Sequence, residues 1–173
     1  MGATAEKLSH LAYQAARVGL RVPDVPLGQL SHGTLDVVHT HALFAGRRAI
    51  VIGIPGAFTP ICEGEHLPGF IANAAKLKQA GFDMICCIAP NDPWVLSRWA
   101  QEVDPGGAIR FLSDGNLAFA RALGLNGRED GFFLGERSRR YVMTLDRAVI
   151  QKLRVDDDIL RLNCTTADAV MLD

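Results

Sequence analysis

The sequence predicts an α/β fold with a central mixed β-sheet and helices on both faces of that sheet. Short apolar runs of strand length alternate along the chain with segments whose apolar residues recur at helical spacing. The last two strand-like runs are separated only by Asp146-Arg147-Ala148, which is typical of a hairpin, and a helical segment follows them. This order favours a sheet that contains both parallel and antiparallel strand pairs.

Each expected element rests on its own stretch of sequence. Strands are expected in six apolar stretches, with the first at an edge of the sheet: residues 34–38, 49–54, 82–89, 109–112, 140–145 and 149–155. Helices are expected in five stretches of helical spacing: residues 3–18, the segment after residue 54 up to about residue 80, and residues 93–103, 117–123 and 166–172. Pro68-Gly69 should bend the second of these helices. Pro93 suits the first turn of the third helix, and Thr165 or Thr166 should cap the last one.

Composition limits the classes of function. The 173 residues are 49% hydrophobic and 21% charged, which is ordinary for one soluble globular domain. The formal net charge is −1 and no long basic run occurs, so neither nucleic acid nor an anionic membrane surface is an expected partner. No apolar stretch approaches the roughly 18 residues of a membrane span, so we expect no membrane association.

The most informative segment is the loop that ends in Cys62. It follows the expected strand at residues 49–54, and Pro55-Gly56 breaks that strand into a turn. A helix should begin close to Cys62, and the backbone N–H groups at a helix N-terminus stabilise negative charge. The sequence therefore predicts an exposed Cys62 that reacts as a thiolate nucleophile and can be oxidised to a sulfenic acid.

A thiolate that attacks a small substrate needs three kinds of support. Thr59, three residues before Cys62, can supply a hydroxyl hydrogen bond. An arginine suits the second role, because its guanidinium is always charged and offers several donors in a rigid fork. Pro55 and Phe58 can form a wall that keeps water from the sulfur.

These residues resemble the active-site loop of peroxiredoxins, and most closely that of the peroxiredoxin V group, also called type II. The signature Pro-x-x-x-Thr-x-x-Cys is present as Pro55, Thr59 and Cys62. Further segments that are similar to the family are His66-Leu67-Pro68-Gly69-Phe70, Asn91-Asp92-Pro93-Trp94, Phe111-Leu112-Ser113-Asp114-Gly115, Ala122-Leu123-Gly124-Leu125 and Arg139-Arg140-Tyr141-Val142-Met143. The resemblance runs from about Val22 to the C-terminus. We therefore expect an N-terminal extension at 1–21, helical and unlike a transit peptide, and a single domain at 22–173.

The resemblance implies a thioredoxin-like fold and a peroxidase that uses no metal, haem or flavin. Cys62 would be the peroxidatic cysteine, which attacks the O–O bond of hydrogen peroxide or a small alkyl hydroperoxide and becomes a sulfenic acid. Thr59 would orient the peroxide and donate to the thiolate, Arg140 would stabilise the developing charge, and Pro55 would shield the site. Thioredoxin, glutaredoxin or glutathione would donate electrons, and the protein would be a cytoplasmic homodimer.

The residue that resolves the sulfenic acid stays open between three possibilities. Cys164 resembles in position the resolving cysteine of animal-type members, and Cys87 matches in spacing a second cysteine of many type II members. An external thiol is the third route. Cys86 and Cys87 share an expected strand, so at most one of them faces the active site. No C-x-x-C motif is present, so neither a zinc site nor a dithiol motif is supported.

Two other classes of function stand beside a peroxidase. The first is a redox sensor or holdase chaperone that is switched by oxidation of Cys62. The second is a cysteine hydrolase, for which His66 is the only nearby histidine that could act as a base. We interpret His66 instead as a structural histidine, and His10, His32, His39 and His41 as ordinary residues without metal-like pairing.

Overall fold

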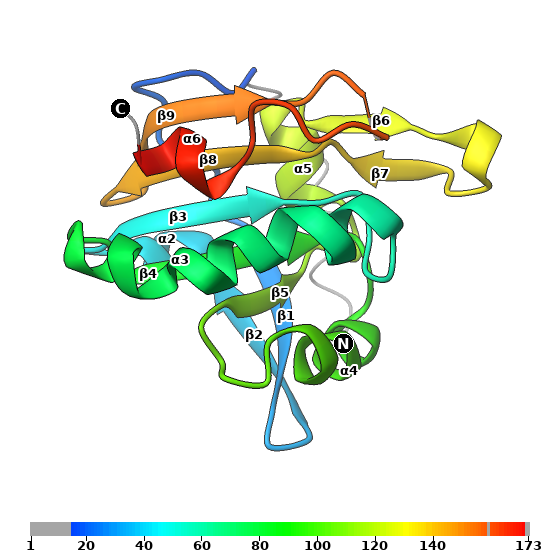
Figure 1. Ribbon diagram of the computed structural model, residues 1–173, viewed down its shortest axis with the longest axis horizontal. Coiled ribbons are helices and arrows are strands. Elements are labelled where there is room, and N and C mark those ends of the chain that lie inside the picture. The colour runs from blue at the N-terminus through cyan, green and yellow to red at the C-terminus, as the bar shows by residue number, and fades with distance from the viewer. Residues whose placement is uncertain (1–14, 159, 172–173) are drawn as a thin grey trace.

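The computed structural model describes residues 15–158 and 160–171, and a seven-stranded mixed sheet forms its centre (Figure 1). The strand order is β2-β1-β5-β4-β3-β8-β9. These strands span Pro26–Ser31 (β1), Thr34–His39 (β2), Arg48–Gly53 (β3), Met84–Ala89 (β4), Arg110–Ser113 (β5), Tyr141–Asp146 (β8) and Val149–Val155 (β9). The β3-β4 and β4-β5 pairs are parallel, whereas the β1-β2, β1-β5, β3-β8 and β8-β9 pairs are antiparallel. The expected mixed sheet is thus confirmed.

Helices cover both faces of the sheet, as expected. They span Thr40–Phe44 (α2), Cys62–His66 (the π-helical turn η1), Leu67–Gln79 (α3), Pro93–Val103 (α4), Ala118–Leu123 (α5), Asp130–Phe132 (the 3-10 turn η2) and Ala167–Met171 (α6). One apolar cluster packs α2 and α5 against the sheet, and a second packs α3, α4 and α6 against the opposite face. Cys86 belongs to the first cluster and Cys87 to the second, which confirms that these neighbours point to opposite faces.

The expected strands and helices inside the domain are all present, with ends that shift by at most two residues outside the active-site helix. Helix α4 matches its prediction, Pro93–Val103, because the Asp92 side chain caps it and accepts hydrogen bonds from the N–H groups of Trp94 and Val95. Thr166 is the residue that caps α6, since its Oγ1 accepts from the N–H of Ala169 at 3.2 Å.

Three elements were not predicted. They are β1, α2 and a small separate hairpin, formed by β6 (Asn126–Arg128) and β7 (Glu136–Ser138) with the 3-10 turn η2 between them. β1 begins with a proline and contains Gly28, both of which are uncommon in strands. α2 is five residues long and β6 and β7 three each, too short for a periodic pattern to be visible.

The predicted N-terminal helix lies mostly outside the described residues. Its last part, residues 15–18, is described and is not helical. The N–H of Ala16 donates instead to the carbonyl of Leu123 at 2.9 Å. Among the helices of residues 15–158 and 160–171, none has both the length and the apolar character needed to cross a membrane.

The bend expected at Pro68-Gly69 stays a prediction, and the irregularity that the structure shows is the π-helical turn η1, directly before α3. Within it the N–H of Leu67 donates to the carbonyl of Cys62, five residues earlier. Pro68 has no N–H to donate, and its ring would crowd the carbonyl four residues before it in a regular α-helix. The wider π turn relieves this crowding, and it does so at the turn that begins with Cys62.

Candidate active site

Pairing between β3 and β8 brings the two halves of the site together. In this antiparallel pair Gly53 lies opposite Tyr141, so the loop that follows β3 meets the residue that precedes β8, Arg140. Gly53 permits the close approach, because a Cβ at this position would lie 2.0 Å from the ring of Tyr141. Strand register thus brings the loop that contains Cys62 close to Arg140, although 78 positions separate the two residues in sequence.

Cys62 lies in the first turn of a helical segment that begins at Pro60. The N–H of Glu63 already donates to the carbonyl of Thr59, and a proline at the first helical position is favourable because its N–H is not needed there. The predicted location at the start of a helix is therefore confirmed. The backbone N–H groups of this first turn have no earlier helical carbonyl to bind, so they lie at the positive end of the helix dipole.

The expectation that Cys62 is exposed is wrong, because the residue has 0% of its surface accessible. It belongs to the apolar cluster that also contains Ile54, Ala57 and Leu67. Access of a small molecule to the sulfur therefore requires local movement of a covering segment.

Arg140 is the arginine that reaches the sulfur. Its Nη2 donates to Cys62 Sγ at 3.6 Å, and only 2% of Arg140 is exposed. Its Nη1 donates to the carbonyls of Asp158 and Arg161 at 3.4 and 3.2 Å. Arg139 turns away and forms an ion pair with Asp157 at 3.8 Å. The choice of Arg140 within this basic run thus agrees with the geometry.

Thr59 and Pro55 lie in the same loop, but their side chains make different contacts. Pro55 is buried and lines a small recess of about 30 Å³ that Arg140 also lines. The Thr59 hydroxyl donates its proton to the carbonyl of Gly56 at 2.7 Å, so that proton stabilises the loop and is not directed at the sulfur. Donation from Thr59 to the thiolate therefore stays a prediction. Phe58 is half exposed and packs on Trp99, with ring centroids 6.1 Å apart.

Asn91 has a role that the sequence reasoning missed. Its Oδ1 accepts a hydrogen bond from the N–H of Ala57 at 2.8 Å and so ties the Cys62 loop to the end of β4. The sequence indicates Asn91 only as part of the family resemblance. The available signal was its position directly after a strand parallel to β3, because parallel neighbours end at the same edge of the sheet.

His66 is a structural histidine, as interpreted from the sequence. It is 1% exposed, and its Nε2 donates to the carbonyl of Thr165 at 2.8 Å. Burial lowers the pKa of His66 to about 4, so the ring is neutral near pH 7. The Nε2 nitrogen is engaged with the C-terminal segment, and Nδ1 makes no hydrogen bond to Cys62, so the described structure shows no cysteine–histidine pair of the kind that a cysteine hydrolase needs.

The four cysteines are all free and differ in their surroundings. Cys164 is partly buried, and its Sγ donates to the Asp156 carboxylate at 3.3 Å and to the Val155 carbonyl at 3.4 Å. Burial and the hydrogen bond to Asp156 raise the pKa of Cys164. Burial raises the pKa of Cys86 to about 12 and also raises the pKa of Cys87. The sites of Cys87 and Cys164 thus both favour the neutral thiol.

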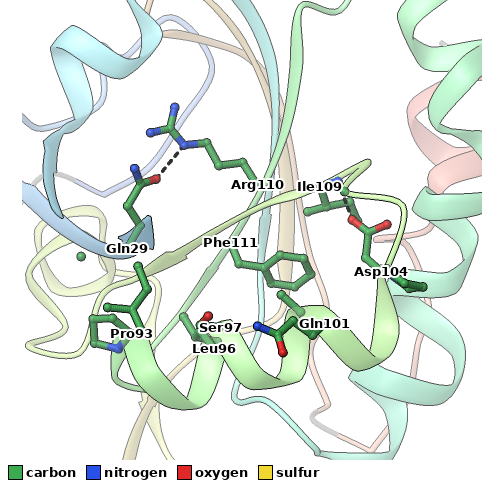
Figure 2. Close-up of a pocket in the computed structure, with 14 residues that line it drawn as sticks. Gln29, Pro93, Leu96, Ser97, Gln101, Asp104, Ile109, Arg110 and Phe111 are labelled. Atoms are coloured by element: carbon green, nitrogen blue, oxygen red, sulfur yellow. Dashed lines mark hydrogen bonds between the residues drawn. The ribbon is translucent and has the colours of Figure 1, made fainter. Parts of the chain in front are cut away.

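Larger cavities lie beside the site rather than at the sulfur. One of about 600 Å³ lies beside η1, and Ile61, Glu65 and Leu162 are among its lining residues. Another of about 540 Å³ lies between β1, α4 and β5, where Phe111 points toward α4 and Arg110 donates to Gln29 (Figure 2). Within residues 15–158 and 160–171 no cluster of three or more His, Cys, Asp or Glu is placed to hold a metal ion.

The chain matches the Redoxin family over residues 17–171. It is 37% identical over 155 residues to the chloroplastic peroxiredoxin-2E of Arabidopsis thaliana, which is 87% of this chain and 66%, just under two thirds, of that protein. It is also 37% identical over 141 residues to peroxiredoxin-2C of Oryza sativa subsp. japonica, which is 81% of this chain and 87% of that protein.

The fold is similar to that of a solved peroxiredoxin. The crystal structure of reduced Prx3 in complex with H2O2 from Vibrio vulnificus superposes with a TM-score of 0.85 and 33% sequence identity. The match covers 91% of this chain and 94% of that one. The expected thioredoxin-like fold is therefore confirmed.

Proposed function

The chain belongs to the Redoxin family and is a peroxiredoxin, and from this membership we propose that it is a thiol-dependent peroxidase that acts at Cys62. It is an oxidoreductase that reduces hydrogen peroxide and small alkyl hydroperoxides. The single observation that carries the assignment to Cys62 is the 3.6 Å contact between Arg140 Nη2 and Cys62 Sγ inside a buried site. Both plant relatives are named peroxiredoxin-2, which agrees with the type II group expected from the sequence.

In the first step the Cys62 thiolate attacks one oxygen of the hydroperoxide. An S–O bond forms while the O–O bond breaks, and the leaving oxygen takes up a proton to give water or an alcohol. The sulfur is oxidised by two electrons to a sulfenic acid, and the peroxide is reduced. The Arg140 guanidinium stabilises the sulfur anion and the charge that develops on the peroxide oxygens, while Pro55 and the apolar cover limit access of water.

In the second step the Cys164 thiolate attacks the Cys62 sulfenic sulfur. An S–S bond forms, hydroxide leaves and takes up the proton that the Cys164 thiol lost, and water is released. A thiol donor then returns two electrons to the disulfide. The π turn at Cys62–His66 supports this step, because an irregular turn at the end of a helix opens at a lower cost than a regular interior one.

Two other routes remain as alternatives within the proposal. In one, Cys87 resolves the sulfenic acid, although it is fully buried on the α3 and α4 face of the sheet. In the other, an external thiol such as glutathione attacks Cys62 directly and forms a mixed disulfide. The electron donor would be thioredoxin for an internal disulfide, and glutaredoxin or glutathione for the one-cysteine cycle.

We further propose a cytoplasmic homodimer that contacts its second copy near the active-site loop. Phe58 and Trp94 support this contact, because they leave 48% and 60% of their surfaces exposed close to that loop. Large exposed aromatic side chains are typical of protein interfaces. A redox sensor is not favoured, because the relatives are peroxiredoxins.

The test is the intact mass of the reduced protein after one equivalent of hydrogen peroxide, with peptide mapping under non-reducing conditions. A loss of two hydrogens, with Cys62 joined to Cys164, is expected. The Cys164→Ser protein should instead gain one oxygen on Cys62, and Cys87→Ser should behave as the wild type. The Cys62→Ser protein should neither change in mass nor consume peroxide. Peroxide consumption that persists in Cys62→Ser would reject the proposed function.

A further inference from the structure

Asp156, directly after β9, is a buried carboxylate that the two steps above do not use. Only 4% of this residue is exposed. Its Oδ1 accepts hydrogen bonds from the N–H and the thiol of Cys164, at 2.8 and 3.3 Å, and its Oδ2 accepts from the hydroxyl of Thr165 at 2.7 Å. A buried carboxylate is costly unless hydrogen bonds satisfy its oxygens. The segment that carries Cys164 is thus organised around this charge.

The same carboxylate faces Arg140. Asp156 Oδ2 lies 3.9 Å from Arg140 Nη1, and each side chain is 1% exposed. The backbone adds a second link, because the N–H of Asp156 donates to the carbonyl of Arg140 at 3.0 Å. The Arg140 guanidinium therefore lies between the sulfur of Cys62 and the carboxylate that binds Cys164.

A further contact joins this network to the turn that contains Cys62. Thr165, which donates to Asp156, also accepts from His66 Nε2 at 2.8 Å, and His66 is the last residue of η1. Movement of the η1 turn therefore strains the contacts that hold Cys164 in place.

Charged groups and hydrogen bonds near Asp156 and Cys164 influence the protonation of both side chains. Although burial opposes ionisation of Asp156, the hydrogen bonds from Cys164 and Thr165 lower its pKa, so it is an anion near pH 7. Its negative charge and its hydrogen bond favour the thiol of Cys164 over the thiolate, whereas Arg154 acts weakly in the opposite sense. Arg139 contacts the backbone carbonyl of Asp156 at 3.3 Å, and the neutral His66 reaches it only through Thr165.

We propose that Asp156 is a positioning residue that keeps Cys164 seated and protonated while Cys62 is reduced, and so sets the order in which the two cysteines react. The proposal rests on the proposed function, because the order matters only if Cys62 is oxidised and Cys164 resolves it. Formation of the neutral sulfenic acid removes the negative sulfur beside Arg140. More of the guanidinium charge then acts on Asp156, which weakens its hold on the Cys164 proton.

The experiment measures the initial rate of alkylation of Cys164 by iodoacetamide from pH 6 to 10 in the reduced protein with Cys62 intact. Peptide mapping separates alkylation of Cys164 from that of Cys62, and the measurement needs no peroxidase turnover. Asp156→Asn should lower the midpoint of the pH profile and increase the rate at pH 7.5 on the order of tenfold, because one pH unit is a tenfold change in thiolate. Asp156→Glu keeps the charge and should keep the high midpoint. Asp157→Asn is the matched control, because this neighbouring side chain is 98% exposed, and it should change nothing.

An unchanged midpoint in Asp156→Asn would overturn the proposal. If Asp156→Asn unfolds, the buried Cys86 and Cys87 will react as well, and Asp156→Glu then decides. A high midpoint in that protein supports a role of the charge, and a midpoint equal to that of an ordinary cysteine rejects it. Failure of the proposed function gives a different result, since the native protein would then not consume peroxide while the alkylation profiles still differ.

Discussion

Cys62 and Cys164 carry the same thiol, but the fold gives them neighbours of opposite charge. Cys62 is fully buried and its sulfur accepts a hydrogen bond from the Arg140 guanidinium. Cys164 is partly exposed and its sulfur donates a hydrogen bond to the Asp156 carboxylate. A cation favours the thiolate and an anion favours the thiol. The difference shows that burial does not by itself decide which cysteine is the nucleophile.

The contrast extends to how each sulfur meets its substrate. Cys62 must be reached by a small molecule through a covered site, so its reaction depends on preorganised charge. In the proposed second step Cys164 must move toward the sulfur of Cys62, so that reaction depends on release of Cys164 from its contacts with Asp156 and Val155. Three predictions follow the comparison from the largest expected effect to the smallest.

Removal of the Arg140 guanidinium should strongly slow the oxidation of Cys62. Arg140→Ala should slow oxidation of Cys62 by hydrogen peroxide by about 10²–10³-fold, because it removes the donor that stabilises both the sulfur anion and the developing charge. Rapid mixing followed by acid quench and mass analysis measures this rate. Arg139→Ala is the control, since this side chain pairs with Asp157, and its rate should stay near that of the wild type. A wild-type rate in Arg140→Ala would contradict the assignment.

His66 links the two cysteine segments in a way that depends on pH. Its pKa falls from 6.5 to about 4 on folding, so between these values the unfolded chain binds a proton that the folded chain does not. This difference in proton binding makes the folded state more stable above pH 6.5, by about 3 kcal/mol relative to low pH. The contribution is lost as the pH falls toward 4. His66→Gln retains a donor for the Thr165 carbonyl but has no such titration.

The measurement for His66 is the free energy of unfolding by urea at several pH values between 4 and 7. As the pH falls from 7 to 4, the wild type should lose free energy of unfolding that His66→Gln keeps. The stability of the wild type relative to the variant should therefore decrease. Asp114 titrates in the same range, because burial raises its pKa to about 6, and its contribution has the opposite sign. It is common to both proteins and cancels in the difference. A difference that is constant with pH would show that His66 is not held neutral.

The smallest effect is expected at Cys164 itself. Cys164→Ser should leave the rate of the first oxidation of Cys62 within about twofold, because its sulfur contacts Asp156 and Val155 rather than Cys62. The outcome of oxidation should change, with a sulfenic or sulfinic acid in place of the disulfide. The same rapid-mixing assay checks the rate. A large loss of rate would mean that Cys164 also takes part in activating Cys62.

Much of the fold was visible in the sequence where local signals agree. Helix α4 was predicted with its correct ends, because Asp92 is a strong cap and Pro93 suits the first helical position. The β8-β9 hairpin was predicted from two apolar runs around a short turn. β1 was missed because its stability comes from pairing with β2 rather than from its own composition.

In the active site, too, features set by local sequence were predicted and those set by distant contacts were not. The position of Cys62 at a strand end and helix start was predicted, because both signals lie within one loop. Its burial was not predicted, because the residues that cover the sulfur pack there only when the sheet and helices assemble. Asn91 was missed for a similar reason, since it reaches the loop from the next strand.

The sequence by itself determined the alternation of strands and helices, the nucleophilic loop at Cys62 and the resemblance to peroxiredoxins. These features depend on local chemistry and on residues close together in the chain. Only the tertiary structure decided which charge each cysteine meets. Register between β3 and β8 brings Arg140 to Cys62, and the return of the chain after β9 brings Asp156 to Cys164. Contacts between distant residues follow from strand pairing and packing, which a local sequence pattern does not specify.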